Sequence, residues 1–263
     1  MKVRTKERKR ELQLELDKVL IVGGDYLYRA LFDELGVVVI EVMTMQELRE
    51  IMPELKAILF TGGADVDPKL YGGIHKDISM ISPMRDKLEQ TVFELALKYS
   101  VKITGICRGF QFINVMCGGK MYQHINNHAG PLHNVTYPAT GKQTLVTSTH
   151  HQLVMLPEDA TPVAWSSNNL SNIYIGPNAD SIEAPEHEME SAIFPQYNAF
   201  GVQFHPEMLR SGNEGRDYYL DVIADFLNKP MEDFISIYGY KGGYHGKEEG
   251  RRENNQLTRG RDN

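Results

Sequence analysis

One segment of the sequence combines a reactive side chain with a sharp turn. Cys107 lies between Gly105 and Gly109, directly after the apolar run that ends at Ile106 and just before an expected helix. Small residues two positions before and two after a nucleophile are what a strand–turn–helix elbow requires. Such an elbow places the thiol at the carboxyl end of its strand and at a helix amino terminus, whose partial positive charge favours a thiolate. We therefore interpret Cys107 as a nucleophile rather than as a buried core cysteine.

A cysteine nucleophile needs a base within hydrogen-bonding distance, and the base needs an orienting group. Among the nine histidines, His205 is the best placed, because it follows the strand-like run 201–204. It would face the same sheet edge as Cys107 if the two strands are parallel. A proline fixes the next turn, so Glu207 can fold back onto the imidazole. The pair His150–His151 is the alternative base, because it also follows a strand-like stretch.

A glycine pair follows another expected strand. Gly62 and Gly63 come shortly after the apolar run 57–60, so the backbone there can approach a ligand and turn an N–H toward it. The N–H of Gly63 is a candidate oxyanion donor beside the N–H of Arg108, which directly follows the cysteine.

The sequence offers little support for a cofactor. Neither glycine pair continues as the G-x-G-x-x-G pattern of dinucleotide-binding loops. The adjacent histidines His150 and His151 could bind a metal, but no cluster at ligand spacing accompanies them in the sequence. We therefore expect neither a cofactor nor a metal.

The elements that must position these residues alternate along the first half of the chain. Apolar runs typical of buried strands occupy residues 19–22, 37–40, 57–60 and 101–106, and helical patterns occupy 26–35, 46–52, 87–99 and 110–117. In the first helix we expect Leu27, Ala30, Leu31 and Phe32 to face inward. This alternation predicts an α/β fold with an open, mostly parallel sheet flanked by helices.

The second half has a different pattern. Short strands are expected at residues 143–148, 161–166, 173–175, 181–184, 192–194 and 199–204, which favours an antiparallel extension of the sheet. An amphipathic helix over 216–226 closes the body. We expect one domain over residues 19–238, a charged extension over 1–18 and a disordered tail over 239–263.

Composition excludes several classes of function. The chain has 263 residues and a net charge of −7, so it lacks the basic footprint of a nucleic-acid-binding protein. No apolar run approaches the ~20 residues of a membrane span, and no secretory signal is recognisable. The two cysteines do not make a disulfide framework, which favours free thiols in a reducing cytoplasm. Cys117, inside an apolar helical stretch, is expected to pack in the core.

Together these segments resemble the class I glutamine amidotransferase family, and within it the γ-glutamyl-γ-aminobutyrate hydrolase branch (peptidase C26). The matching segments are residues 105–111, continued by Asn114, Val115, Gly118 and Gly119; residues 61–68 with Tyr71; Arg85, Asp86 and Glu89; and residues 148–152, 182–184 and 201–207. They run in the family's order from about residue 19 to residue 227 of the chain.

The resemblance implies a Cys107–His205–Glu207 triad that cleaves a γ-glutamyl amide through a cysteine thioester, with Gly63 and Arg108 as oxyanion donors. It implies a small-molecule substrate and no cofactor, and it leaves a homodimer or a partner synthase open. The residues implied to hold the glutamyl end are Gly62, Gln111, Thr149 and His150. Residues 133–148 are shorter than in that branch, and His124 replaces an acidic residue, which leaves the identity of the released amine open.

Three alternatives share the elbow. A glutaminase would pass ammonia to a partner synthase through a docking surface and a tunnel. A non-catalytic binding protein would have a damaged triad, whereas all three residues are present here. A related intracellular peptidase would carry a histidine directly after the nucleophile, where this chain has Arg108.

Overall fold

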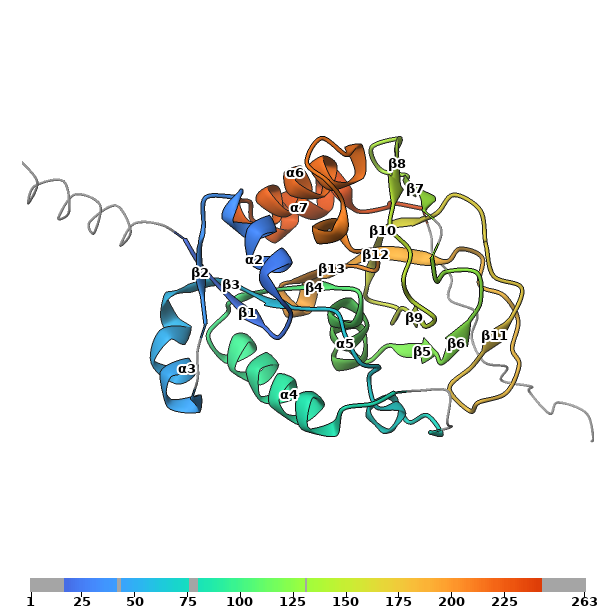
Figure 1. Ribbon diagram of the computed structural model, residues 1–263, viewed down its shortest axis with the longest axis horizontal. Coiled ribbons are helices and arrows are strands. Elements are labelled where there is room, and N and C mark those ends of the chain that lie inside the picture. Colours follow the sequence, from blue (N-terminus) through green and yellow to red (C-terminus); the bar gives the residue numbers. More distant parts are fainter. Residues whose placement is uncertain (1–16, 42–43, 76–79, 131, 243–263) are drawn as a thin grey trace, which may run out of the picture.

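The computed structural model describes residues 17–41, 44–75, 80–130 and 132–242. Its centre is a nine-stranded sheet in the order β2-β1-β3-β4-β13-β12-β10-β7-β8 (Figure 1). The first five strands in this order run parallel: β2 (Val38–Ile40), β1 (Lys18–Val22), β3 (Leu55–Phe60), β4 (Lys102–Ile106) and β13 (Ala199–Val202). The other four pair antiparallel: β12 (Met189–Phe194), β10 (Thr161–Ser166), β7 (His133–Tyr137) and β8 (Lys142–Val146). The predicted parallel sheet with an antiparallel extension is confirmed.

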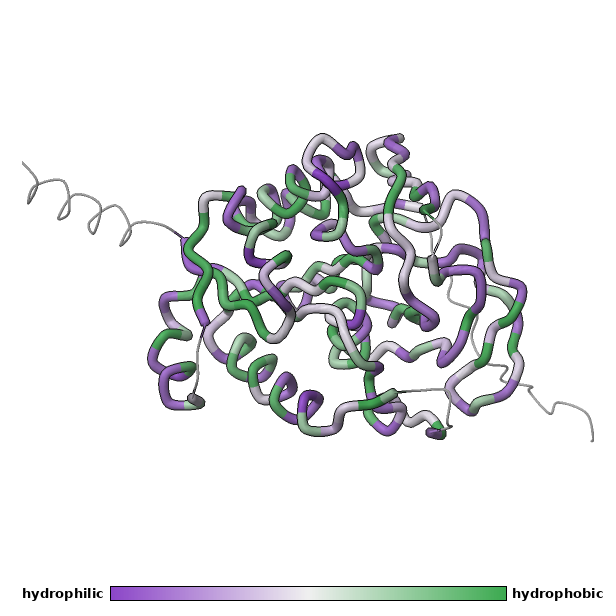
Figure 2. The backbone as a smooth tube through the Cα atoms, viewed as in Figure 1, coloured by the Kyte–Doolittle hydropathy of each residue, from purple (hydrophilic) through white to green (hydrophobic). Residues whose placement is uncertain are grey.

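Helices cover both faces of this sheet (Figure 1). One face carries α2 (Tyr26–Asp33), α6 (Glu214–Asn228) and α7 (Met231–Tyr238); the other carries α3 (Met45–Ile51), α4 (Pro83–Lys98) and α5 (Arg108–Met116). Each face has its own apolar core, because strands buried on both sides must be apolar on both. Figure 2 shows these apolar strands in the centre and helices of mixed hydropathy around them.

Shorter elements complete the body. Two small antiparallel ribbons pair β5 (Lys120–Tyr122) with β9 (Leu153–Met155), and β6 (His124–Ile125) with β11 (Tyr174–Ile175). Four 3-10 turns follow larger elements: η1 (Met52–Glu54), η2 (Pro68–Tyr71), η3 (Pro195–Tyr197) and η4 (Pro206–Met208).

Several sequence expectations need correction. Ala30 is exposed, because the buried stripe of α2 consists of Tyr28, Leu31 and Phe32 at helical spacing. Helix α4 begins at Pro83, four residues before its expected start, because proline is well suited to the first helical position. The strand expected over residues 181–184 is reduced to a single bridge at Ser181. Strands β5, β6, β7 and β9 and helix α7 were not predicted from the pattern.

Most of the expected extension and tail, residues 1–16 and 243–263, lies outside the described residues. Strand β1 begins at Lys18 and α7 ends at Tyr238, but the division into an extension, one domain and a tail stays a prediction. Within the described part of the chain, every helix is too short or too polar to cross a bilayer.

Candidate active site

The expected turn at Cys107 is present between β4 and α5. Cys107 adopts φ 53° and ψ −109°, a strained conformation for a residue with a side chain. Close packing requires glycine on both sides of it. A Cβ on Gly105 would lie 2.4 Å from the carbonyl carbon of Gly109, and one on Gly109 would lie 2.0 Å from the carbonyl oxygen of Phe60. The elbow is thus pressed against the end of β3, which leads into the glycine pair.

The pairing of β13 with β4 determines which residues surround the thiol. Val202 is level with Ile106, and the Cys107 N–H donates to the Val202 carbonyl at 2.8 Å. Gln203 therefore lies beside the cysteine, with its Nε2 3.6 Å from Sγ. His205 follows two residues later at the same sheet edge, so the parallel arrangement that the sequence argument required is present.

His205 is held from both sides. Its Nδ1 lies 2.5 Å from Glu207 Oε1, within the turn η4, and its backbone N–H donates to Thr147 Oγ1 at 2.8 Å. Burial by itself lowers the pKa of His205, but hydrogen bonds with the Cys107 thiol and the Glu207 carboxylate raise that pKa to about 10. The structure therefore brings Cys107, His205 and Glu207 together, and it favours an imidazole that keeps its proton at neutral pH.

Tyr28 is a site residue that the sequence reasoning missed. Its hydroxyl accepts from the Gly62 N–H at 3.1 Å, while burial and the nearby Glu207 raise the pKa of Tyr28 far above its ordinary value. Gly62 also lies against His205, because a Cβ there would be 2.7 Å from His205 Cε1. The offset of the α2 stripe is what turns Tyr28 inward. The apolar pattern had placed Leu27 and Ala30 inward and therefore did not single out Tyr28.

A buried ion network supports the glycine loop. The Arg108 guanidinium contacts Asp86 and Glu89, and its Nε donates to the Ala64 carbonyl at 3.0 Å. Burial and the neighbouring Arg85 lower the pKa of Arg108 to about 10.

Arg85 completes this support from the first turn of α4. It donates to the carbonyls of Gly62 and Thr61 at 2.9 and 2.8 Å, and its Nε lies 2.7 Å from Glu89. The resemblance had singled out Arg85, Asp86 and Glu89 without assigning them a role. Their contacts indicate that they position the loop that follows β3.

The residues expected to hold substrate differ in their surroundings. Gln111 is buried, and its Nε2 contacts the Gln152 carbonyl at 3.3 Å and Gln203 Oε1 at 3.2 Å. Thr149 is exposed and bridges to Ala129. His150 is buried, with its two ring nitrogens beside the Gln152 carbonyl and the Glu190 carboxylate. These contacts favour His205 over His150 as the base.

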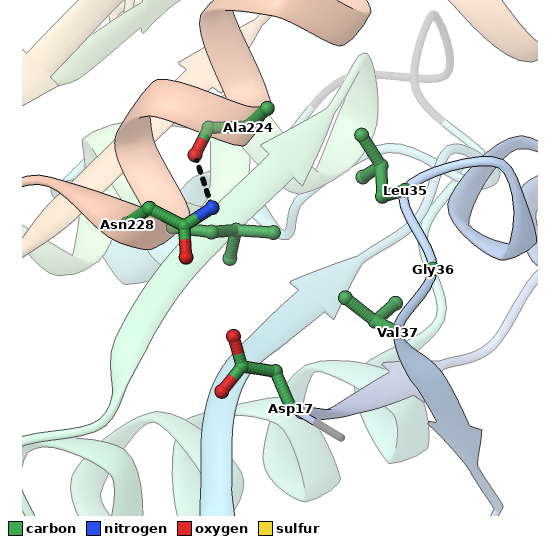
Figure 3. Close-up of a pocket in the computed structure, with 7 residues that line it drawn as sticks. Asp17, Leu35, Gly36, Val37, Ala224 and Asn228 are labelled. Carbon is green, nitrogen blue, oxygen red and sulfur yellow. Dashed lines mark hydrogen bonds between the residues drawn. The ribbon is translucent and has the colours of Figure 1, made fainter. Parts of the chain in front are cut away.

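A separate pocket lies at the amino ends of the parallel strands (Figure 3). Its walls come from Asp17 and from residues 35–37, where β1 and β2 begin, and from the last turn of α6. Parallel strands place their starts and ends at opposite edges, so this pocket is remote from Cys107. The Asn228 side chain beside it donates to the Ala224 carbonyl at 2.9 Å, and we assign the pocket no part in the chemistry.

A parallel sheet with a strained cysteine at its carboxyl edge, facing a histidine–glutamate pair that follows the adjacent strand, defines the class I glutamine amidotransferase fold. A solved glutamine amidotransferase of Thermotoga maritima is similar, with a TM-score of 0.51 and 17% identity over 84% of this chain and 90% of that one. The chain belongs to the Peptidase C26 family, whose model matches residues 28–207.

Two relatives from Lactococcus lactis are described as glutamine amidotransferase-like. The YvdE homolog of subspecies cremoris is 33% identical over 123 residues, which make up 46% of this chain and 63% of that protein. YvdE of subspecies lactis is 28% identical over 199 residues, with 67% of this chain and 77% of that protein covered. Family and relatives support an amidohydrolase type of activity.

Proposed function

We propose that the chain hydrolyses a γ-glutamyl amide bond through a thioester on Cys107, releasing glutamate and an amine. The observation that carries the proposal is the His205 imidazole, which lies 2.5 Å from Glu207 on one side and interacts with the Cys107 thiol on the other. A nucleophile, a base and an orienting carboxylate in contact are the constellation of covalent acyl transfer.

The reaction then has two halves. The Cys107 thiolate attacks the γ-carbonyl, and the backbone N–H groups of Gly63 and Arg108 stabilise the oxyanion by about 3–4 kcal/mol each. His205 donates its proton to the amine as the C–N bond breaks, which leaves the glutamyl thioester. It next takes a proton from water, whose oxygen attacks the thioester and releases glutamate and the thiolate. Glu207 holds the imidazole throughout.

The glutamyl end of the substrate would lie between the glycine loop and the segment that leads into β9. Gly62, Gln111, Thr149 and the backbone around His150 border this space in the proposal. The Gln111 amide nitrogen already contacts Gln152 and Gln203, so its contribution is to keep the pocket wall and the residue beside the thiol in place.

The proposal is tested with the purified chain and a panel of γ-glutamyl amines, with glutamine as the comparison. We expect at least one γ-glutamyl amine to be hydrolysed faster than glutamine, with glutamate and free amine released in equal amounts. Turnover of glutamine alone, and only after a synthase is added, would assign the chain to the glutaminases that supply ammonia to a partner. Absence of hydrolysis across the whole panel would contradict the proposal.

Gly63→Ala tests the glycine loop. Gly63 has a φ of +140°, and a Cβ there would lie 2.2 Å from Arg85 Nη1, so an alanine must displace either the loop or the arginine. Losing one oxyanion donor in this way should lower kcat by about 100- to 1,000-fold.

Gly212→Ala is the matched control for this substitution. Gly212 also has a positive φ, 83°, but open space surrounds the position of its Cβ. It should therefore share the backbone strain, about 1–3 kcal/mol, without a loss of activity. Full kcat in Gly63→Ala would remove Gly63 from the proposed oxyanion site.

A further inference from the structure

Five buried polar side chains form a cluster. Only one of them, His150, is also among the residues proposed to border the glutamyl end of the substrate. The five are His128, His133, His150, Glu188 and Glu190, each at most 6% exposed. Glu190 is central: its Oε1 lies 3.1 Å from His133 Nε2, 3.6 Å from His150 Nε2 and 3.9 Å from His128 Nδ1. One ligand atom from each of His128, His133 and Glu190 lies within 4.8 Å of the others.

The outer hydrogen bonds decide where the ring protons are. His128 Nε2 lies 2.9 Å from Glu188, a carboxylate that also accepts from the backbone N–H groups of Leu170 and Ser171, so this nitrogen is the donor. Its Nδ1 then presents a lone pair toward Glu190. The Ser148 hydroxyl lies 3.3 Å from this Nδ1 and 2.5 Å from the His128 carbonyl, and its single proton goes to the nearer acceptor, the carbonyl.

His150 repeats this arrangement from another segment. Its Nδ1 lies 2.9 Å from the Gln152 carbonyl, which can only accept, so its Nε2 carries the lone pair. That Nε2 points toward Glu190 and makes no hydrogen bond among the described residues, and neither does the second carboxylate oxygen of Glu190. Buried acceptors therefore face one another, an arrangement that is costly unless a cation lies between them.

The spacing distinguishes an ion from ring protons. At 3.6 and 3.9 Å, the His150 and His128 nitrogens are too far from Glu190 Oε1 for good hydrogen bonds. Ligand atoms held about 2.0–2.1 Å from one tetrahedral zinc ion are about 3.3 Å apart. Glu190 Oε1 lies 3.1–3.9 Å from the three nitrogens, which is near this value, and the ligand atoms of His128, His133 and Glu190 lie within 4.8 Å of one another. Imidazole and carboxylate are also ligands that zinc accepts.

We propose that the protein binds one Zn²⁺ through His128 Nδ1, His133 Nε2, His150 Nε2 and Glu190 Oε1. Four protein ligands make a closed site, which is typical of structural rather than catalytic zinc. Binding releases the proton between His133 and Glu190, and the tautomer of His133 can change because its Nδ1 has no hydrogen-bond partner in the described part of the chain. Glu188 and the Gln152 carbonyl are the outer partners that zinc-binding histidines usually have.

The ion would connect parts of the chain that are distant in sequence. His128 follows β6, His133 opens β7, His150 precedes β9 and Glu190 belongs to β12. The adjoining Gln152 carbonyl contacts Gln111, which in turn contacts the Gln203 side chain beside Cys107. Zinc would therefore stabilise the segment around Gln152 that contacts Gln111. His133 and Glu190 are 57 residues apart, so the sequence spacing that suggested no metal could not reveal this group.

The site is tested on the full chain, first stripped with a chelator and then incubated with ZnCl₂ and passed through gel filtration. Mass spectrometry of the metal should find about one zinc ion per chain, as expected for one closed site. Zinc should raise the Tm, and Co²⁺ in its place should show the intense visible absorption of a tetrahedral ion. Wild-type protein that retains no zinc would overturn the proposal without the need for any variant.

Variants then locate the ion. Glu190→Gln and His133→Asn, checked for folding by circular dichroism, should lose the retained zinc and the shift in Tm. Glu188→Gln keeps all four ligands and should weaken zinc binding by about 10- to 100-fold. His75→Gln changes an exposed histidine and should bind zinc like the wild type. Equal zinc retention in folded Glu190→Gln would show that the ion binds elsewhere and would also overturn the proposal.

Discussion

Replacing Cys107 by alanine should abolish hydrolysis of γ-glutamyl amides, with kcat lower by about 10⁴- to 10⁶-fold. The reason is that no thioester can form without the sulfur, so only the binding site and the oxyanion donors remain. Residual rates from those groups alone are small in enzymes that use a covalent intermediate. The measurement is release of glutamate from the best γ-glutamyl amine, at saturating substrate. Turnover in Cys107→Ala close to that of the wild type would rule out the proposed mechanism.

Cys117→Ala provides the matched control. Cys117 is the other cysteine of the chain, is 4% exposed and packs in the core, where burial raises the pKa of its thiol. This variant should keep its activity, although the lost core contacts should cost some stability. Because the raised pKa keeps the Cys117 thiol protonated, iodoacetamide should modify Cys107 well before Cys117. Modification of Cys107 should inactivate the enzyme. Inactivation that follows modification of Cys117 instead would contradict the assignment of the nucleophile.

Glu207→Gln should lower kcat/KM by about 100- to 10,000-fold while leaving the fold intact. Glu207 lies 2.5 Å from His205 Nδ1 and can only accept, so it holds the proton on the nitrogen that faces away from sulfur. A glutamine of the same shape can turn its NH₂ toward Nδ1, which favours the opposite tautomer. Steady-state kinetics at neutral pH measure the loss. Glu232→Gln, on the exposed side of α7, is the control and should behave like the wild type.

The pH profile separates this positioning role from general damage. Hydrogen bonds with Cys107 and Glu207 raise the pKa of His205 to about 10 against the effect of burial. In the wild type, kcat/KM should therefore persist through neutral pH and fall only as His205 loses its proton near that value. Removing the Glu207 charge removes one cause of the raised pKa, so the basic limb of the profile should move to lower pH. A uniform loss with an unchanged limb would point to misfolding rather than to loss of the orienting carboxylate.

The identity of the candidate triad follows from local sequence features. Glycines at 105 and 109 are required because neighbouring backbone atoms leave no space for a Cβ, and such crowding is specific to a sharp strand-to-helix turn. His205 and Glu207 are two residues apart with a proline between them, so their contact depends on one short turn. Features that depend on a few neighbouring residues can be predicted from sequence, because backbone sterics and hydrophobic periodicity act over the same short distances.

The tertiary structure decided which distant segments meet. Cys107 and Gln203 are 96 residues apart, and only the pairing of β13 with β4 places them in contact. The contacts of Arg85 with the glycine loop and the histidine–glutamate cluster around Glu190 likewise join separate elements.

The sequence by itself therefore determined the parallel strands with the helices between them, the elbow and the His–Pro–Glu turn of this protein. It did not determine the strand order, the inward turn of Tyr28, the buried arginine network or the candidate zinc ligands. Those depend on how both faces of the sheet pack and on which buried charges find partners there, and such energies arise between segments that have no regular spacing along the chain.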